Sequence, residues 1–290
     1  MSEGAPSPAP PPHRSELLRR VGTAVVVLPL LLAGMLWAPP LVGFAIVTLA
    51  VALGAWEFDG LLRARDVKAF RVTGAAALVL VYANVGLVGG PVGSHEGSHF
   101  SVPLWPLVAV LGLTALLFRT RDFARDVPAA ALTMLGAVYL GGLGGAIAGL
   151  RFMPPIDLGA WRILLLLAIV MAADTAAYFV GRALGRHKLA PAISPGKTIE
   201  GAVGGVAGGV LGAWAVSAAG LHLPGAHVVV LGVLVTLFAI VGDLLESLLK
   251  RWAGVKDSGR LFPGHGGMLD RLDSLLFGAA VLYYYFSLSG

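Results

Sequence analysis

The sequence contains no cysteine and few charged residues. The absence of cysteine excludes disulfide bonds, thiolate metal sites and a cysteine nucleophile. Only 13% of the 290 residues are Asp, Glu, Lys or Arg, whereas a soluble globular domain carries about 25%. Because 57% of the residues are hydrophobic and the mean hydropathy is +0.83, much of the chain is predicted to face lipid.

Long apolar runs, separated by short polar segments, fill most of the sequence. A helix needs about 20 residues to cross a bilayer, lipid admits only helices or closed barrels, and no alternating barrel pattern is present. We therefore expect an all-α polytopic membrane protein with about nine spans. The predicted spans are 21–38, 40–57, 72–89, 103–118, 128–149, 161–180, 199–220, 227–248 and 272–288.

Three parts of the chain are distinguished by composition. Residues 1–13 are rich in Pro, Ala and Ser and are expected to form a disordered tail. Residues 14–150 are expected to hold plain N-terminal membrane helices. Residues 151–290 are expected to hold C-terminal helices whose connecting loops carry most of the clustered polar side chains.

Basic residues fall on one side of the predicted spans. If the N-terminus is cytoplasmic, all Lys and Arg residues except Arg151 and Arg162 lie in cytoplasmic segments. This positive-inside bias predicts a cytoplasmic N-terminus and an outside C-terminus. The net charge of +5 is then explained by topology, and no nucleic-acid partner is expected.

Glycines recur at four-residue spacing in the fifth and seventh predicted spans. This spacing places them on one face of a helix, where they let a neighbouring helix approach closely. They are Gly141, Gly145 and Gly149 in the fifth span, and Gly204, Gly208 and Gly212 in the seventh.

The sixth predicted span contains a carboxylate, Asp174. An ionisable group inside an apolar span costs free energy unless it is paired, so it indicates function by default. Tyr178 and Arg182 follow at four and eight residues and share its helix face. The alternative is a structural pair of Asp174 with an arginine that ties two helices together.

The following loop carries Ser194, Lys197 and Thr198 just before the seventh predicted span. The Gly-Lys-Thr sequence there is not a Walker motif, because Pro191 replaces the required glycine and no strand is predicted before it. The N-terminus of a helix still favours phosphate, and Pro195 suits a first helical turn. The alternative is an ordinary capped helix with cytoplasmic lysines.

Two polar stripes flank the last connecting loop. Helical spacing places the polar residues of the eighth span on one face, and those of the ninth span form a second stripe. The residues are Asp243, Glu246, Ser247 and Lys250, then Asp270, Asp273 and Ser274. The glycine-rich turn 263–267 between them can adopt backbone conformations that other residues avoid, and it includes His265, which alone would be only a turn residue.

The donor types in these segments favour magnesium over zinc. Carboxylates beside phosphate-binding cations suit Mg²⁺, which prefers oxygen ligands and bridges to substrate phosphates. No His or Cys set has zinc spacing. His95 and His99 lie in a Gly- and Ser-rich outer loop, where a solvated loop is the favoured interpretation over a metal site.

The segment from Ser247 to Asp273 resembles the signature of the phosphatidate cytidylyltransferases (CDP-diacylglycerol synthases). The matching pieces are Ser247-Leu-Leu-Lys-Arg251, Lys256-Asp257 and His265-Gly-Gly-Met-Leu-Asp-Arg-Leu-Asp273. Asp174-x-x-x-Tyr178-x-x-Gly181-Arg182, Ser194-Pro-Gly-Lys-Thr198 and Gly242-Asp243 resemble further motifs of the family in the right order. Glu57 is the main similarity in the first half, and Gly196 departs from a basic residue found in many relatives.

The resemblance implies an enzyme of the bacterial inner membrane, with its site facing the cytoplasm. It would act on CTP and phosphatidic acid, use Mg²⁺ with a monovalent cation such as K⁺, and form a homodimer. It implies Asp243 and Asp270 as metal ligands. The implied catalytic residues are Asp174, Lys197, Asp243, Lys250, Arg251, Lys256, Asp257, His265, Asp270, Arg271 and Asp273. The implied phosphate contacts are Arg182, Ser194, Lys197, Thr198, Lys250, Arg251, Lys256 and Arg271.

Two other classes of membrane protein compete with this interpretation. A secondary transporter also uses intramembrane carboxylates and glycine-interrupted helices, but it predicts comparable polar sites in both halves of the chain. An alcohol phosphotransferase that consumes CDP-lipids would need an Asp-Gly-x-x-Ala-Arg opening. The segment starting at Asp59 has the last two residues reversed and lacks the aspartates that should follow.

Overall fold

The computed structural model describes residues 33–34, 36–88, 105–259, 261 and 266–289. The predicted tail 1–13, most of the predicted span 21–38, and both His95 and His99 lie outside the described residues.

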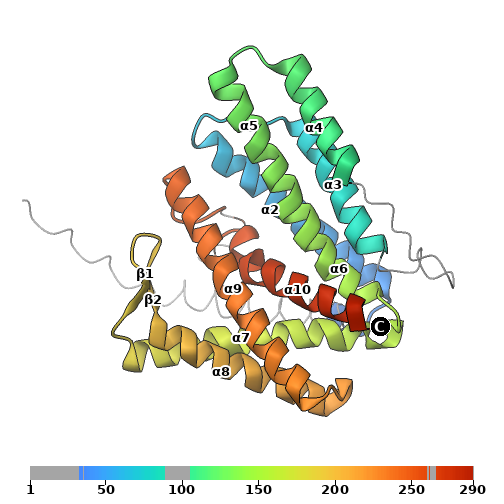
Figure 1. Cartoon of the computed structure of the whole chain (residues 1–290), viewed down its shortest axis with the longest axis vertical. Helices are drawn as coiled ribbons and strands as arrows, with labels where there is room; N and C mark the ends of the chain where they lie inside the picture. The colour runs from blue at the N-terminus through green and yellow to red at the C-terminus, as the bar shows by residue number, and fades with distance from the viewer. Residues whose placement is uncertain (1–32, 35, 89–104, 260, 262–265, 290) are drawn as a thin grey trace, which may run out of the picture.

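Helices form most of the described chain (Figure 1), as the apolar pattern predicts. They are α2 (Pro40–Arg63), α3 (Arg71–Val88), α4 (Trp105–Arg119), α5 (Phe123–Gly136), η1 (Ala137–Gly142), α6 (Leu143–Phe152), η2 (Ile156–Leu158), α7 (Gly159–Leu184), α8 (Ile199–Val216), η3 (Ser217–Leu221), α9 (Gly225–Ala253) and α10 (Leu269–Ser289). Every predicted span from 40–57 onward coincides with a helix.

Six helical stretches in the described part of the chain are long and apolar enough to cross a membrane. They are Pro40–Arg63, Phe123–Phe152, Ile156–Leu184, Ile199–Leu221, Gly225–Ala253 and Leu269–Ser289. Two further apolar helices, Arg71–Gly86 and Pro106–Arg119, are shorter. The all-α polytopic class is thus confirmed, while the predicted number of nine spans is not.

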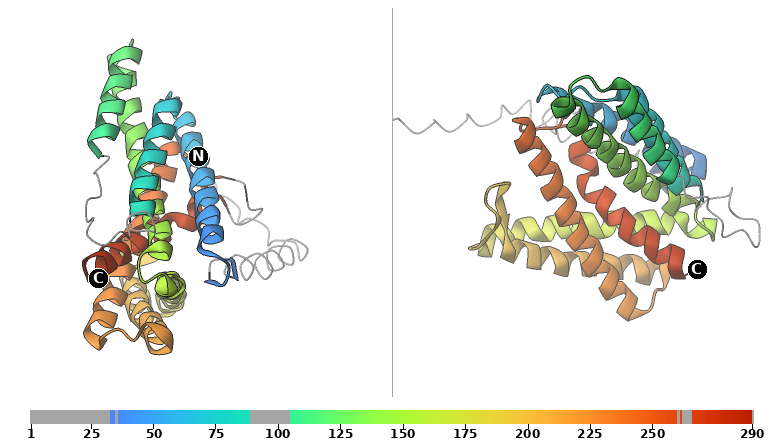
Figure 2. Two further views of the ribbon diagram at one scale, coloured as in Figure 1. Left: turned by 90° about the vertical axis from the view of Figure 1, so that its right-hand side faces the viewer. Right: turned by 45° about the horizontal axis from the view of Figure 1, so that its top comes forward.

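Helices α7 and α8 lie side by side and run steeply across the direction of α2 to α6 (Figures 1 and 2). The predicted glycine stripe makes their contact possible. A methyl group on Gly208 would lie 2.5 Å from the Ala176 Cβ and 2.6 Å from the Ala172 carbonyl oxygen. Gly212 lies equally close to the Ala168 carbonyl. The stripe therefore serves packing between neighbouring helices, as predicted.

The second glycine stripe packs in the same way against α3. Gly141 lies against the carbonyl of Leu78 and Gly145 against that of Tyr82. Between α5 and α6 the chain widens into a π-helical turn, η1, which carries Tyr139. Such turns are found often at functional sites, and the Tyr139 side chain is indeed buried beside the polar residues described below.

One hydrophobic core joins the two halves of the chain. Leu140 and Leu150 from the first half and Leu166, Leu231 and Leu276 from the second are all nearly inaccessible to solvent and belong to it. Helix α10 packs against both α9 and α6. The first turns of α10 contact both halves, because Gly54 of α2 lies next to Leu269 and Leu272 and Gly242 of α9 lies next to the Asp273 carbonyl.

A short antiparallel hairpin departs from the prediction that every element is helical. Strands β1 (Lys188–Ala190) and β2 (Ser194–Thr198) pair between α7 and α8. Pro195 therefore lies in a strand, and its predicted place in the first turn of a helix was wrong. Thr198 is the cap instead, because its hydroxyl oxygen accepts the N–H of Gly201 at 3.1 Å. A two-stranded ribbon has free edges that tolerate proline.

The two arginines that break the positive-inside pattern bind backbone carbonyl groups. Arg162 is 3% exposed and donates to the carbonyls of Met153, Pro154 and Pro155, with its guanidinium 5.1 Å from the centre of the Phe286 ring. Arg151 also donates to backbone carbonyls, one of them in a different segment. Both arginines have a structural role in binding backbone carbonyl groups, which explains why they do not follow the positive-inside distribution.

Replacing Arg162 by alanine should destabilise the protein by about 3 kcal/mol, because hydrogen bonds from a buried charged donor contribute about 1.5–3 kcal/mol. The measurement is the apparent melting temperature of the purified protein in detergent. Arg186→Ala, at an exposed loop position, is the matched control and should leave that temperature unchanged. Equal melting temperatures for the two variants would contradict the role given to Arg162.

Candidate active site

The start of α8 meets the middle of α9 through an ion pair. Lys197, the residue before the Thr198 cap, places its Nζ 2.6 Å from Oδ2 of Asp243. The Asp243 Oδ1 atom accepts a long hydrogen bond of 3.4 Å from Ser247, one turn further along α9. Lys197 and Asp243 are both only partly buried, with side chains 25% and 33% exposed. This pair is accessible from outside the protein.

A second ion pair, more deeply buried, lies two turns further along α9. Lys250 contacts Glu246 on its own helix and Asp270 at the start of α10, where its Nζ lies 2.5 Å from Oδ1. The Glu246 side chain is fully buried, and those of Lys250 and Asp270 are 16% and 12% exposed. The predicted stripe on α9 is therefore confirmed, and it meets the predicted stripe on α10.

Glycines at both ends of the last loop let the chain turn back. Gly254 ends α9 with φ +74°, and the N–H of Val255 closes the turn on the carbonyl of Lys250. Gly266 has φ +79°, a conformation that the predicted glycine-rich turn allows. Immediately afterwards Oδ2 of Asp270 accepts the N–H of Gly267 at 2.7 Å. His265 lies outside the described residues.

Asp273, at the start of α10, is close enough to both ion pairs to interact with them electrostatically. Its charge interacts with those of Asp243, Lys197 and Lys250. Helices α9 and α10 are in backbone contact at this level, because a methyl group on Gly242 would overlap the Asp273 carbonyl. Tyr139 on η1 is near the same group, and its buried hydroxyl has no hydrogen-bond partner among the residues that the structure describes.

Asp174 belongs to the same electrostatic neighbourhood. It is exposed on α7, and the charges of Asp243 and Lys197 act on it. Arg182 instead donates to the hydroxyl of Tyr178 at 2.9 Å. The alternative of an Asp174–arginine pair that ties helices together is thus not what the structure shows.

The other predicted residues lie around this centre. Arg251 is exposed and donates to the Ile193 carbonyl of the hairpin at 3.5 Å. Lys256 and Asp257 are exposed in the loop after α9, and Arg271 is exposed in the first turn of α10. Ser194 lies in the hairpin, half-buried, while the Thr198 hydroxyl is buried and accepts a hydrogen bond as a helix cap.

The family is decided by comparison with known proteins. The model of the cytidylyltransferase family matches residues 18–289. This chain belongs to that family. It is 39% identical to a phosphatidate cytidylyltransferase of Brucella suis over 276 residues, which cover 93% of each chain. It is 32% identical to one of Bacillus subtilis over 279 residues, covering 95% and 98%, and 34% identical to one of Synechocystis over 270 residues, covering 83% and 87%.

The structure also brings to this centre Glu57, which the resemblance marked only as a similarity in the first half, and Tyr139, which no motif identified. Glu57 on α2 is 2% exposed and bonds to the hydroxyl of Ser258 and to the backbone at the start of α10. Tyr139 reaches the site from η1. Glu57 had a usable signal, because α2 continues to Arg63 and thus places this carboxylate inside an apolar helix.

The oxygen donors of the site fit a magnesium ion. Among the residues that the structure describes, no three His, Cys, Asp or Glu side chains are arranged to hold a metal. Mg²⁺ does not require such a cage, since it is commonly held by one or two carboxylates, water and substrate phosphates. Asp243 and Asp270 would supply these carboxylates. In the structure each of these two carboxylates has one oxygen next to a lysine ammonium group, which shows that both positions attract a cation.

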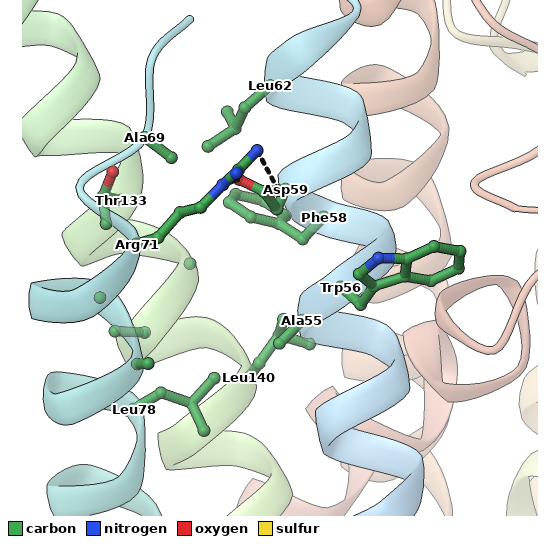
Figure 3. Close-up of a pocket in the computed structure, with 14 residues that line it drawn as sticks. Ala55, Trp56, Phe58, Asp59, Leu62, Ala69, Arg71, Leu78, Thr133 and Leu140 are labelled. Carbon is green, nitrogen blue, oxygen red and sulfur yellow. Dashed lines mark hydrogen bonds and ion pairs between the residues drawn. The ribbon is translucent and has the colours of Figure 1, made fainter.

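A small pocket lies elsewhere, between α2, α3 and the α5–η1 segment (Figure 3). Its volume is about 250 Å³ and its lining is mainly apolar, with Arg71 reaching toward Asp59 at 3.2 Å. Five residues of α2 line it: Ala55, Trp56, Phe58, Asp59 and Leu62. At 100° per residue these face away from Glu57. The pocket is therefore separate from the polar centre.

Proposed function

We propose that this chain transfers the cytidylyl group of CTP to phosphatidic acid and so produces CDP-diacylglycerol and pyrophosphate. One observation carries the proposal. Two ion pairs, Lys197–Asp243 and Lys250–Asp270, bring the start of α8, the second half of α9 and the start of α10 together in one polar centre among apolar helices. All three segments lie within the match to the cytidylyltransferase family. The relatives that it resembles over most of their length are named phosphatidate cytidylyltransferases.

The reaction requires positioning and charge neutralisation more than acid–base chemistry. A phosphate oxygen of phosphatidic acid forms a bond to the α-phosphorus of CTP, and the bond from that phosphorus to the bridging oxygen breaks. Pyrophosphate leaves with the electron pair. Because a phosphate monoester is already an anion at neutral pH, the attacking oxygen needs no strong base.

Cations from several elements would hold the phosphates. Lys197 and Lys250 lie in the centre, while Arg251, Lys256 and Arg271 surround it on exposed positions. Arginine suits bidentate contacts to phosphate. Mg²⁺, held by Asp243 and Asp270, would neutralise charge on the triphosphate. Asp174 and Asp273 would orient these cations through their charges. A role for K⁺ is part of the proposal only through the family resemblance.

We further place the enzyme in the bacterial inner membrane, with about nine spans and the N-terminus in the cytoplasm. The supporting observation is that the basic ends of several helices lie together. Arg65, after α2, donates to the Trp252 carbonyl at the end of α9, and Arg119, at the end of α4, stacks on Phe70. A cytoplasmic site would meet CTP directly. A homodimer is proposed from the resemblance alone.

The test is incubation of the purified protein with phosphatidic acid and CTP labelled in its α-phosphate, with and without Mg²⁺. We expect label in a chloroform-soluble product only when Mg²⁺ is present. CTP labelled in its γ-phosphate should give no labelled lipid, because that phosphate leaves in pyrophosphate. A folded protein that yields no labelled lipid under any of these conditions would overturn the proposed function.

A further inference from the structure

Glu57 is a buried carboxylate that joins the first half of the chain to the start of α10. Its Oε1 accepts the N–H of Met268 at 2.9 Å, and its Oε2 accepts the N–H of Leu269 at 2.8 Å. These N–H groups belong to the first turn of a helix, where no partner exists within the helix itself. A negative charge is also favourable at this end of the helix dipole. Glu57 therefore acts as a cap supplied by another helix.

Ser258 connects this cap to Asp270. Its hydroxyl lies 3.1 Å from Oε2 of Glu57 and 2.7 Å from Oδ2 of Asp270. A serine hydroxyl has only one hydrogen, so the two carboxylates share this single donor. The backbone N–H of Ser258 adds a further bond to Oδ2 at 3.0 Å, and Gly267 adds another at 2.7 Å.

The two oxygens of Asp270 are consequently in different environments. Oδ2 is held by the Ser258 and Gly267 groups, all in the segment that Glu57 anchors. Oδ1 contacts the Lys250 ammonium at 2.5 Å, and the buried Glu246 carboxyl also interacts with Asp270. The arrangement fixes the carboxylate so that Oδ1 is the oxygen that faces a cation.

The backbone around Glu57 is fitted closely to its carboxylate. A methyl group on Gly259 or Gly267 would overlap the carboxylate oxygens of Glu57. Any side chain at either position would displace Glu57 or the loop. The segment that carries Asp270 thus has little freedom to move without Glu57.

We infer that Glu57 is a positioning residue for Asp270, which it orients through Ser258 and the first turn of α10 so that Oδ1 can bind the divalent cation. The inference rests on the proposed function for its role in catalysis. Residues that orient a metal ligand typically change metal affinity or activity by about 10- to 100-fold when they are replaced.

The test compares Glu57→Gln with Asp59→Asn, a change two residues away on the same helix. Asp59 bonds only to Arg63 and Arg71 in the described part of the chain, on the opposite face of α2. Binding of Mn²⁺, followed by electron paramagnetic resonance without substrates, should weaken about 10- to 100-fold in Glu57→Gln and remain as in the wild type in Asp59→Asn. The Mg²⁺ concentration for half-maximal turnover should rise by the same factor.

Ser258→Ala is the second variant, because it keeps the contacts of Glu57 to α10 and removes only the shared hydroxyl. It should weaken Mn²⁺ binding by a smaller factor without loss of the fold. If both variants bind Mn²⁺ like the wild type and differ only in melting temperature, Glu57 is a structural cap and the inference is overturned. Mn²⁺ binding is measured without CTP or lipid, so this result is independent of the proposed substrates.

Discussion

Replacing Asp243 or Asp270 by asparagine should reduce the formation of CDP-diacylglycerol at least about 10³-fold, or about 4 kcal/mol of transition-state stabilisation. Asparagine keeps the shape of the side chain and removes the charge that attracts Lys197 or Lys250 in the structure. It would also remove the carboxylate proposed to hold Mg²⁺. The measurement is label transferred from CTP to lipid at saturating Mg²⁺.

The two variants should differ in stability even though both lose activity. Asp243 is partly exposed and pairs with a partly exposed lysine, so Asp243→Asn should melt near the wild-type temperature. Asp270 is more deeply buried and accepts three hydrogen bonds from Ser258 and Gly267 in addition to that from Lys250, so Asp270→Asn should melt lower. Asp59→Asn is the control for both measurements. Turnover near normal in either site variant would refute the proposed metal ligands.

Replacing Lys250 by methionine should lower the stability of the fold and abolish the activity. The ammonium group is the cation between Glu246, which is fully buried, and Asp270. Breaking a buried ion pair by removal of one partner costs about 3–5 kcal/mol, because a charge is left without compensation. The melting temperature in detergent should therefore fall well below that of Arg251→Met, the change of the exposed neighbouring cation.

A double variant separates the structural role of Lys250 from its catalytic role. Glu246→Gln added to Lys250→Met removes one of the two uncompensated carboxylates and should restore much of the melting temperature. Activity should stay lost, because the positive charge beside Asp270 remains absent. If the double variant recovered activity together with stability, Lys250 would have no direct part in phosphate binding or charge neutralisation.

Local features of the site could be predicted from the sequence, and contacts between distant segments could not. The pair of Glu246 and Lys250 follows from their four-residue spacing on one helix. The pairing of Lys197 with Asp243 could not be predicted from spacing, because 45 residues of chain and one further helix separate the two residues. Pro195 was misplaced because capping residues occur at both Ser194 and Thr198, and only the hairpin register selects Thr198.

Site residues that lie outside any sequence motif were the hardest to recognise from the sequence. Tyr139 belongs to no motif, and the π-helical turn that points it toward Asp273 has no clear sequence signal. Ser258 is an ordinary serine in a polar loop until Asp270 and Glu57 are placed on either side of it. For the fold, the apolar pattern was sufficient, because each predicted span in the described part of the chain did become a helix.

The contact of Glu57 with the start of α10 has a consequence for the order of synthesis. Glu57 precedes its backbone partners Met268 and Leu269 by more than 200 residues. A ribosome therefore completes almost the whole polypeptide before the groups that satisfy this carboxylate exist. Any nascent chain that has not yet reached Met268 has an acidic side chain in α2 without its final partners. The proposed substrate-binding centre is consequently among the last parts of the newly made protein to become complete.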